Sequence, residues 1–423
     1  MNLKGLFRLP QNLPYLKESL TSVGWRAASA LAVGKIIAIG FGPAGTALFG
    51  QAMNLYGTLN NLPGDALARA MVREGNAARA AGDEEGAGKA AFTAMMLLFG
   101  LYLLLALISW LIATNTAWFN PFQAAAGIRQ YLLGFALLGF GSFSASWFLI
   151  WGKTRLQAMS ASLMSLGGLL GLVIAWLAGL SFFDCLLAFF LGQAAGSLAW
   201  LIYRLADLPH FFSMENWSTA MSGKLLRFAL ALAGSGLANL LLQYVLVQWA
   251  LEKMGAEPVG KWMAMNRLAD AFNIPILAIA NSILLPTLTG LAGNHEGLRN
   301  FIRPIFRQSL FWLIPGILIL WLIYPWLLQI LFSREFSAPA NLLPWQLAGD
   351  YFRSSTCVFA VLMLAKGHTR YYFWLESASA LFMLAGTLIL YPHYGFASLF
   401  MVHASRYLLY WLAIVLPYRR IFL

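Results

Sequence analysis

The stretch Ser22–Gly45, SVGWRAASALAVGKIIAIGFGPAG, is an apolar run of helix length that carries two cations, Arg26 and Lys35, and ends in a glycine-proline break. A charge at the centre of a bilayer costs about 2.5–3.5 kcal/mol on insertion scales. One cation could reach the headgroups, but on a helix these two are separated by roughly 13 Å along the axis. The run therefore predicts a membrane helix whose two cations bind an anionic group.

Helix geometry leaves two arrangements open for this pair. On an ideal helix Arg26 and Lys35 lie about 180° apart. Both can face one cavity only if the helix is unwound or bent between them, for which Gly34 is a candidate. Otherwise Arg26 belongs to the cytoplasmic mouth and Lys35 alone faces the interior, and we favour this second arrangement.

Composition places the chain among polytopic membrane proteins. Of its 423 residues 60% are hydrophobic and 10% charged, and apolar runs of span length recur throughout. The formal net charge of +12 is read as loops that face anionic lipid headgroups, not as a nucleic-acid surface. The two cysteines form no disulfide framework or metal spacing, and no catalytic motif is present. We expect a non-enzyme without cofactor or metal.

The apolar runs predict an all-α integral membrane protein with twelve transmembrane helices. The expected spans are 20–40, 45–67, 90–112, 126–150, 158–179, 182–203, 226–250, 262–290, 308–331, 343–365, 371–391 and 396–418.

The basic residues give this topology an orientation. Of the 28 Lys and Arg residues, nineteen fall in one alternate set of loops and termini, and three lie on the other side. The remaining six lie within spans: Arg26, Lys35, Arg129, Arg267, Arg353 and Arg406. The bias puts both termini in the cytoplasm.

The chain divides into two halves that resemble each other. The segment Asn61-Leu62-Pro63 recurs as Asn273-Ile274-Pro275, and Ala52-Met53-Asn54 recurs as Ala264-Met265-Asn266 at the same offset. Six spans per half make the repeats parallel, around a central cavity. The predicted parts are a cytoplasmic amphipathic segment 1–19, an N-lobe 20–204, a linker 205–225 and a C-lobe 226–423.

Pro63 and Pro275 lie at matching depths of the two repeats. Each removes a backbone hydrogen bond and bends its helix. Such bends serve as hinges in transporters, but membrane helices also tolerate proline without a functional role, and both interpretations stay open.

Charged residues within the second-half spans are candidates for ion coupling. Arg267 and Asp270 are three residues apart, as are Asp350 and Arg353, so each couple lies on one helix face and can form a local ion pair. Carboxylates and histidines at membrane depth are also candidates for a proton relay. The alternative is that these residues neutralise one another and lock helix packing. The full set is Asp270, Asp350, Arg353, Glu376, His403 and Arg406.

Several motifs give the chain a family resemblance. Gly34-Lys35 with Phe41-Gly42-Pro43-Ala44-Gly45, and later Trp345-Gln346-Leu347-Ala348-Gly349-Asp350, are similar to segments of bacterial O-antigen-type flippases. These flippases belong to the multidrug/oligosaccharidyl-lipid/polysaccharide exporter superfamily. The resemblance implies a 6+6 fold that moves an undecaprenyl-pyrophosphate-linked oligosaccharide across the inner membrane by alternating access, coupled to an ion gradient.

The residues and the resemblance agree on the substrate chemistry. Cations that lack acidic neighbours in the first half would stabilise a pyrophosphate in a medium of low dielectric constant. The predicted pyrophosphate-binding residues are Lys35, Arg26, Arg129 and Arg267. The expected partners are the lipid-linked oligosaccharide, membrane lipids, and a polysaccharide polymerase with its chain-length regulator.

Two other classes remain as alternatives. A cation-coupled multidrug antiporter of the same superfamily would need unpaired acids to hold cationic drugs. A non-transporting scaffold of polysaccharide assembly fits the hydropathy equally well. Neither is favoured by the cationic first half.

Overall fold

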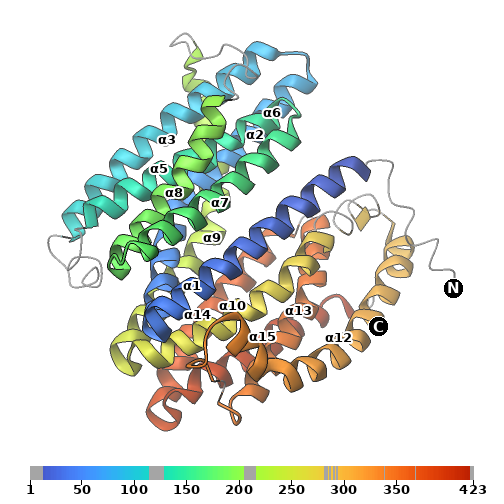
Figure 1. Ribbon diagram of the computed structural model, residues 1–423. Helices are drawn as coiled ribbons and strands as arrows, with labels where there is room; N and C mark the ends of the chain where they lie inside the picture. Colours follow the sequence, from blue (N-terminus) through green and yellow to red (C-terminus); the bar gives the residue numbers. More distant parts are fainter. Residues whose placement is uncertain are drawn as a thin grey trace. The chain divides into compact units, whose positions relative to one another are not determined.

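The computed structural model describes residues 13–113, 128–203, 216–280 and 294–419, apart from positions 338 and 367, together with isolated positions between 284 and 291. These ranges form helices and turns and contain no strand (Figure 1). The predicted all-α fold is confirmed.

The described part of the chain contains thirteen α-helices and one π-helix. They are α1 Leu13–Asn60, the π-helix η2 Asn61–Ala66, α2 Leu67–Ala80, α3 Glu84–Ala113, α5 Ile128–Ala145, α6 Trp147–Ile150, α7 Thr154–Leu177, α8 Phe182–Tyr203, α9 Thr219–Met254, α10 Ala256–Ile279, α12 His295–Leu331, α13 Leu343–Ala365, α14 Thr369–Tyr394 and α15 Ala397–Val415.

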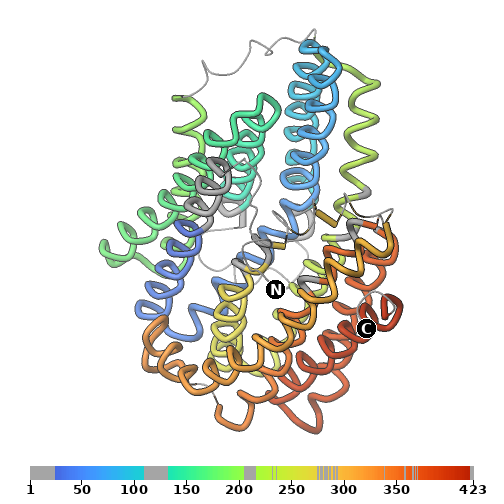
Figure 2. The backbone as a smooth tube through the Cα atoms, turned by 90° about the vertical axis from the view of Figure 1, so that its right-hand side faces the viewer, coloured from blue at the N-terminus to red at the C-terminus, as the bar shows by residue number. Residues whose placement is uncertain are grey.

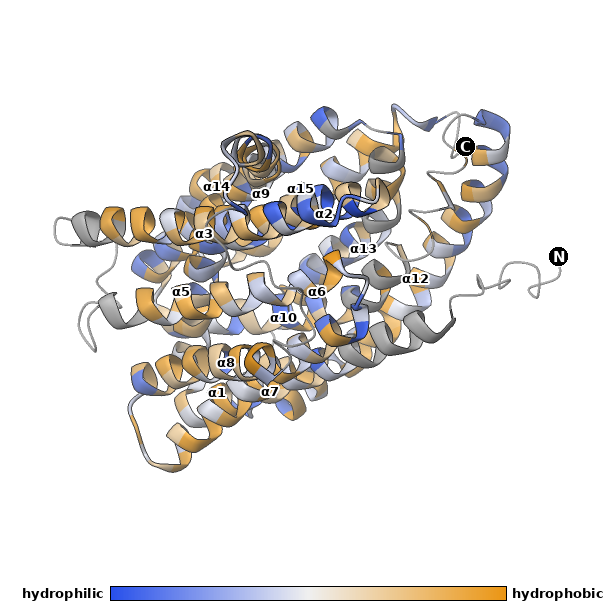
Figure 3. Ribbon diagram, turned by 90° about the horizontal axis from the view of Figure 1, so that it is seen from above, coloured by the Kyte–Doolittle hydropathy of each residue, from blue (hydrophilic) through white to orange (hydrophobic). Residues whose placement is uncertain are grey.

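The described helices account for the twelve predicted spans. Eight are long and apolar enough to cross a membrane, and α9, bent by 43° between Gly234 and Gly236, makes a ninth. The longest of the eight, Gly24–Ala80, contains two predicted spans. Helix α13 coincides with the predicted span 343–365, and α10 overlaps the first part of the span 262–290; both carry charged residues. Apolar residues line the membrane-length helices, whereas α2 is largely hydrophilic (Figure 3).

The glycine-proline break of the opening stretch is a true kink. Gly42 has φ 64° and ψ −164°, so α1 is two helical arms that meet there. Pro43 disfavours a helical conformation of the residue before it, and a positive φ suits glycine. Close contacts fix the kink, because a Cβ on Gly260 would lie 1.8 Å from the carbonyl oxygen of Pro43.

By its internal contacts the chain forms two compact units. Unit 1 comprises Met1–Val33 and Leu55–Leu237, and unit 2 comprises Gly34–Asn54 and Ala238–Leu423. The kinked part of α1 thus packs within unit 2. Glycines permit this, since a Cβ on Gly50 would lie 2.2 Å from the Met263 side chain. The predicted lobes follow the sequence repeat, so their bounds differ from those of the units and stay a prediction.

Unit 1 contains a tightly packed helical hairpin of α7 and α8. Added Cβ atoms on Gly167 and Gly192 would each lie 2.2–2.3 Å from the carbonyl oxygen of the other glycine, and Gly171 and Gly196 approach the facing backbone as closely. Helix α5 lies against α8, and α2 lies against α3 (Figure 1). In the α7–α8 hairpin these glycines let the two backbones come into contact, and such close packing stabilises helix pairs in membranes.

Unit 2 is built around α13, which packs against α12, α14 and α15 (Figure 2). One apolar cluster includes Trp262, Tyr324 and Phe400, and another includes Phe306 and Phe359. Along α13 and α15, Asp350 and His403 follow residues of the first cluster and precede residues of the second.

The α7–α8 contact gives a stability prediction. Gly192→Ala should destabilise the protein by about 1–3 kcal/mol, because the methyl group must push two backbones apart. Gly223→Ala is the matched control, since its Cβ meets nothing within 4 Å and alanine favours a helix. The thermal midpoint of the detergent-solubilised protein measures both, and equal midpoints would contradict the packing described.

Candidate functional site

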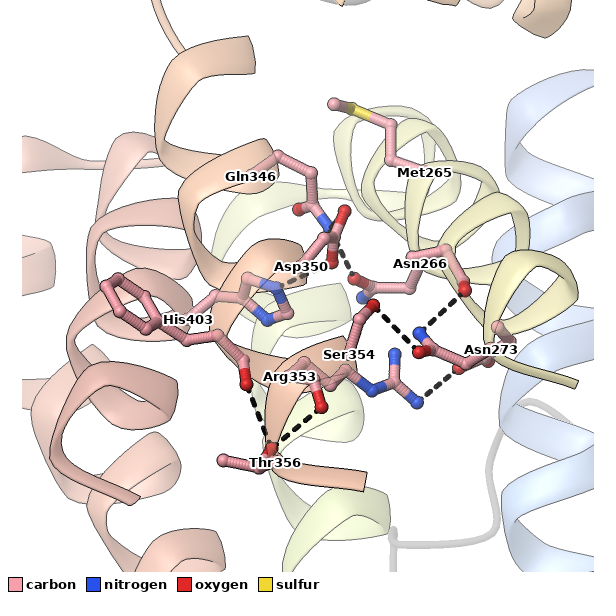
Figure 4. A network of polar contacts seen from close by, with 12 residues as sticks. Met265, Asn266, Asn273, Gln346, Asp350, Arg353, Ser354, Thr356 and His403 are labelled. Carbon is pink, nitrogen blue, oxygen red and sulfur yellow. Dashed lines mark hydrogen bonds and ion pairs between the residues drawn. The ribbon is translucent and has the colours of Figure 1, made fainter. Parts of the chain in front are cut away.

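A buried polar network joins α10, α13 and α15 in the interior of unit 2 (Figure 4). At its centre the carboxylate of Asp350 lies 3.0 Å from Nε2 of His403, and the two side chains are 8% and 6% exposed. Gln346 donates to both carboxylate oxygens of Asp350 at 3.1 and 3.2 Å. Because Asp350 is bound by an imidazole and an amide, the free-energy cost of removing its carboxylate from water is offset.

Gly349 makes this approach possible. A Cβ at Gly349 would lie 2.1 Å from Cδ2 of His403, so a side chain there would displace the imidazole. The glycine sits in the Gln346–Asp350 turn of α13 and leaves a gap into which α15 inserts its histidine. Within the segment Trp345–Asp350, Gln346 and Asp350 thus supply the polar contacts and Gly349 supplies the space for His403.

Asparagines of α10 extend the network away from Asp350. Gln346 also donates to Oδ1 of Asn266 at 3.3 Å. Further along, Ser354 donates to Oδ1 of Asn273 at 2.8 Å, and Asn273 returns its own amide to the carbonyl of Ala269 at 2.9 Å. Polar groups of α10 and α13 are therefore paired over two helical turns.

The charges are paired between helices, and not within one helix as their spacing would allow. Arg353 pairs with Asp270 of another helix at 2.5 Å, and Asp350 binds His403 and not Arg353. The guanidinium of Arg267 lies 4.6 Å from the ring centre of Phe49. Helix packing decides which charges pair, because α13 lies against α10 and brings Arg353 within ion-pair distance of Asp270.

Helices α14 and α15 carry a second group of polar contacts. Glu376 accepts a hydrogen bond from Tyr410 at 2.6 Å, and Nε of Arg406 donates to Ser379 at 2.7 Å. Both Arg353 and Arg406 face the ring of Tyr407, at 5.7 and 5.0 Å. The predicted set from Asp270 to Arg406 therefore gathers in unit 2, on four helices.

Lys35 and Arg267 also belong to unit 2. Lys35 donates to the carbonyl of Ile330, in the last turn of α12, where backbone carbonyls lack helical partners. A Cβ on Gly34 would lie 4.0 Å from Arg267, and one on Gly50 would lie 3.8 Å from it. The arginine is thus held beside both arms of the kinked α1.

Arg26 and Lys35 fall in different units of the structure. The only non-helical residue within the described part of α1 is Gly42, so the bend at Gly34 that would turn both cations to one cavity is not found. Arg26 is exposed and belongs to unit 1. This geometry favours separate roles. The side chain of Arg129 lies outside the described residues.

A polar cluster in unit 1 was not predicted. Asn60 donates to Asp65 at 3.4 Å, and the Tyr102 hydroxyl donates to Oδ1 of Asn60. Between Asn60 and Asp65 the chain forms η2, with Pro63 buried inside. The run of two asparagines, Pro63 and a glycine was its available signal, but only the tertiary contact with α3 shows that these groups meet.

The two proline motifs adopt different backbones. Pro63 lies in a π-helix, a widened turn often found at functional positions. Pro275 lies within the α-helical range of α10, and its side chain is outside the described residues. The hinge role of both prolines stays a prediction. Among the described residues no group of three His, Cys, Asp or Glu side chains could hold a metal ion.

The arrangement of unit 2 predicts a coupled polar network. Because Asp270 is 54% exposed on its side chain, its contribution is near that of a surface pair, about 1 kcal/mol. Asp270→Asn and Arg353→Gln should each destabilise the protein, and the double variant should be less destabilised than the sum by about that amount. Unfolding midpoints of the four proteins measure the coupling, and strict additivity would refute it.

The sequence of this chain is similar to those of known proteins over most of its length. Residues 31–291 match the family described as polysaccharide biosynthesis protein. The chain is similar to the lipid III flippase of Escherichia coli K12, with 25% identity over 91% of this chain and 94% of that one, and equally to the lipid III flippase of Shigella flexneri.

Solved structures share the fold. A multidrug resistance MATE family transporter of the MOP superfamily aligns with a TM-score of 0.80 at 15% identity, covering 96% of this chain and 98% of that one. The lipid II flippase MurJ aligns with a TM-score of 0.69 at 12% identity, covering 96% and 88%.

Proposed function

Because this chain belongs to the polysaccharide biosynthesis protein family, we propose that it is a flippase for lipid-linked oligosaccharides. Its substrate is an undecaprenyl-pyrophosphate-linked glycan of the enterobacterial common antigen or O-antigen type. The glycan moves from the cytoplasmic to the periplasmic leaflet of the bacterial inner membrane by alternating access. The similarity to lipid III flippases over nearly the whole chain is the observation that carries the proposal.

The cations of unit 2 support an anionic substrate. Lys35 donates to a backbone carbonyl, and Arg267 lies against an aromatic ring while the charge of Asp270 also acts on it. Neither of these two contacts is an ion pair, so a diphosphate would bind either cation more strongly by charge-assisted hydrogen bonds. Lys35 and Arg267 are therefore the pyrophosphate ligands in this proposal, and Arg26 acts at the cytoplasmic entrance.

A multidrug antiporter is the second candidate, because MATE transporters share the fold. A site for cationic drugs would need acids without partners. Asp270 and Asp350 instead bind Arg353 and His403, and Glu376 accepts from Tyr410. Drug efflux in a pump-deficient strain separates the candidates, since a flippase confers no resistance.

Complementation of a flippase-deficient strain tests the proposed function. The wild-type chain should restore glycan assembly at the cell surface, and Lys35→Ala should lower it about tenfold, because one charge-assisted hydrogen bond is worth about 1.5–3 kcal/mol. Lys35→Arg should retain part of the activity.

Lys261→Ala is the control for loss of a lysine. Lys261 binds Glu257 at 2.8 Å at the start of α10, and this hydrogen bond lowers the pKa of the Glu257 carboxyl. Its removal should leave glycan assembly unchanged. Full assembly with Lys35→Ala would exclude the anion role, and no assembly with the expressed wild type would exclude the function.

Ion coupling belongs to the Asp350–His403 pair in this proposal. Two titratable groups at 3.0 Å, both buried, can hold a proton between them and release it when the helices move. The alternative, that the pair only locks α13 to α15, predicts lost stability without a changed response to pH gradients.

Asp350→Asn should remove the stimulation of transport by an imposed pH gradient in proteoliposomes. Asp184→Asn is the matched control, because Asp184 lies exposed in the first turn of α8 and accepts from Ser181 at 2.6 Å. If the combined amide variants of Asp270, Asp350 and Glu376 respond to the gradient as the wild type does, proton coupling through these acids is wrong.

A further inference from the structure

Helix α12 carries an arginine stripe, defined here as Arg299, Arg303 and Arg307. The three residues recur every four positions, so each is turned by only about 40° from the last and rises by roughly 6 Å. Arg299 and Arg307 are exposed, and Arg303 is half-buried. Apart from these arginines, the only full charge in the 37 residues of α12 is Glu296, in its first turn.

The rotation of α12 that exposes this stripe is fixed by its neighbours. Leu298, Ile302 and Phe306, each one position before an arginine, are 0–3% exposed. They belong to the apolar cluster that also contains Phe359 of α13 and Ile414 of α15. Turning the arginines inward would expose these three apolar side chains.

Like charges four residues apart repel and weaken a helix. Three arginines in succession, with one acid beside them, therefore form an arrangement that an anion would stabilise. Arginine presents a planar fork of donors that matches phosphate oxygens, which lysine does not. Asn300 and Gln308 are exposed at the margins of the stripe and add amide donors.

The same face of α12 continues as an apolar ridge. By helical phase, Phe311, Ile314, Leu318, Trp321 and Leu322 follow the arginines within one arc. These five side chains are 50–65% exposed. One helix thus offers a cationic end for a headgroup and a long apolar surface for a tail.

We propose that this face of α12 binds the substrate lipid before transport, with the arginine stripe on its diphosphate and the apolar ridge along its polyprenyl chain. The inference rests on the proposed function and adds a site to it. A diphosphate is favoured over a phospholipid headgroup, because its two adjacent phosphates can engage two neighbouring guanidinium groups at once.

Native mass spectrometry of the detergent-solubilised full-length protein tests the site with undecaprenyl diphosphate as the probe. Arg299→Gln/Arg307→Gln removes two exposed charges and should raise the Kd at least tenfold. Arg299→Lys/Arg307→Lys should raise it less, since charge is kept and the donor fork is lost. Arg299→Gln alone, expected to show a smaller rise, serves if the double variant does not fold.

Arg370→Gln is the matched control, an exposed arginine in the first turn of α14 within the same unit. It should leave the Kd unchanged. Phosphatidylglycerol, as the second probe, should bind the wild type more weakly and respond less to the double variant.

Unchanged binding of undecaprenyl diphosphate by the double variant would overturn the site. Equal binding and equal loss for phosphatidylglycerol would also overturn it, by showing a general anionic-lipid surface. Either result leaves the flippase proposal intact if the wild type restores glycan assembly, whereas failed assembly rejects the function independently of binding.

Discussion

The desolvation cost of charge in an apolar interior is the constraint on which the rest of this structure depends. An ionised side chain removed from water must find an opposite charge, a hydrogen-bond donor or an aromatic face, or it destabilises the fold by several kcal/mol. In unit 2 the acid Asp350 satisfies this requirement with His403 and Gln346. Its partners come from two helices, so satisfying one carboxylate also sets the position of α15 against α13.

Glycine is the means by which these partners meet. Gly349 lets His403 reach Asp350, and Gly260 lets α10 contact the kink at Pro43. Gly167 and Gly192 bring the backbones of α7 and α8 together in unit 1. In each case a methyl group would occupy the space taken by a neighbouring atom. Close backbone approach therefore supports both the packing of the bundle and the pairing of its charges.

The two kinds of charge in unit 2 are held differently. Asp270 and Asp350 are bound by Arg353 and His403, whereas Lys35 and Arg267 contact a neutral carbonyl and a ring. The arginine stripe of α12 lies on a face with a single acid. Negative charge is thus largely satisfied within the unit, and positive charge keeps capacity for an external anion. This asymmetry fits an anionic lipid-linked substrate better than a cationic drug.

The membrane class, the all-helical fold and the break at Gly42–Pro43 could be predicted from the sequence alone. Apolar run length and proline chemistry are local properties, and they do not depend on what lies across the bundle. The titratable residues of the unit 2 network could also be found there, because a charge within an apolar run stands out without a structure, whereas its amide and hydroxyl members could not.

The partners of these side chains follow from helix packing. Spacing along one helix suggested that Asp350 pairs with Arg353, yet packing joins Asp350 to His403 and Arg353 to Asp270. The cluster around Asp65 and the outward rotation of the α12 arginines were hidden for the same reason. Which side chains meet depends on the rotation and register of neighbouring helices, and these are set by contacts between residues far apart in the chain.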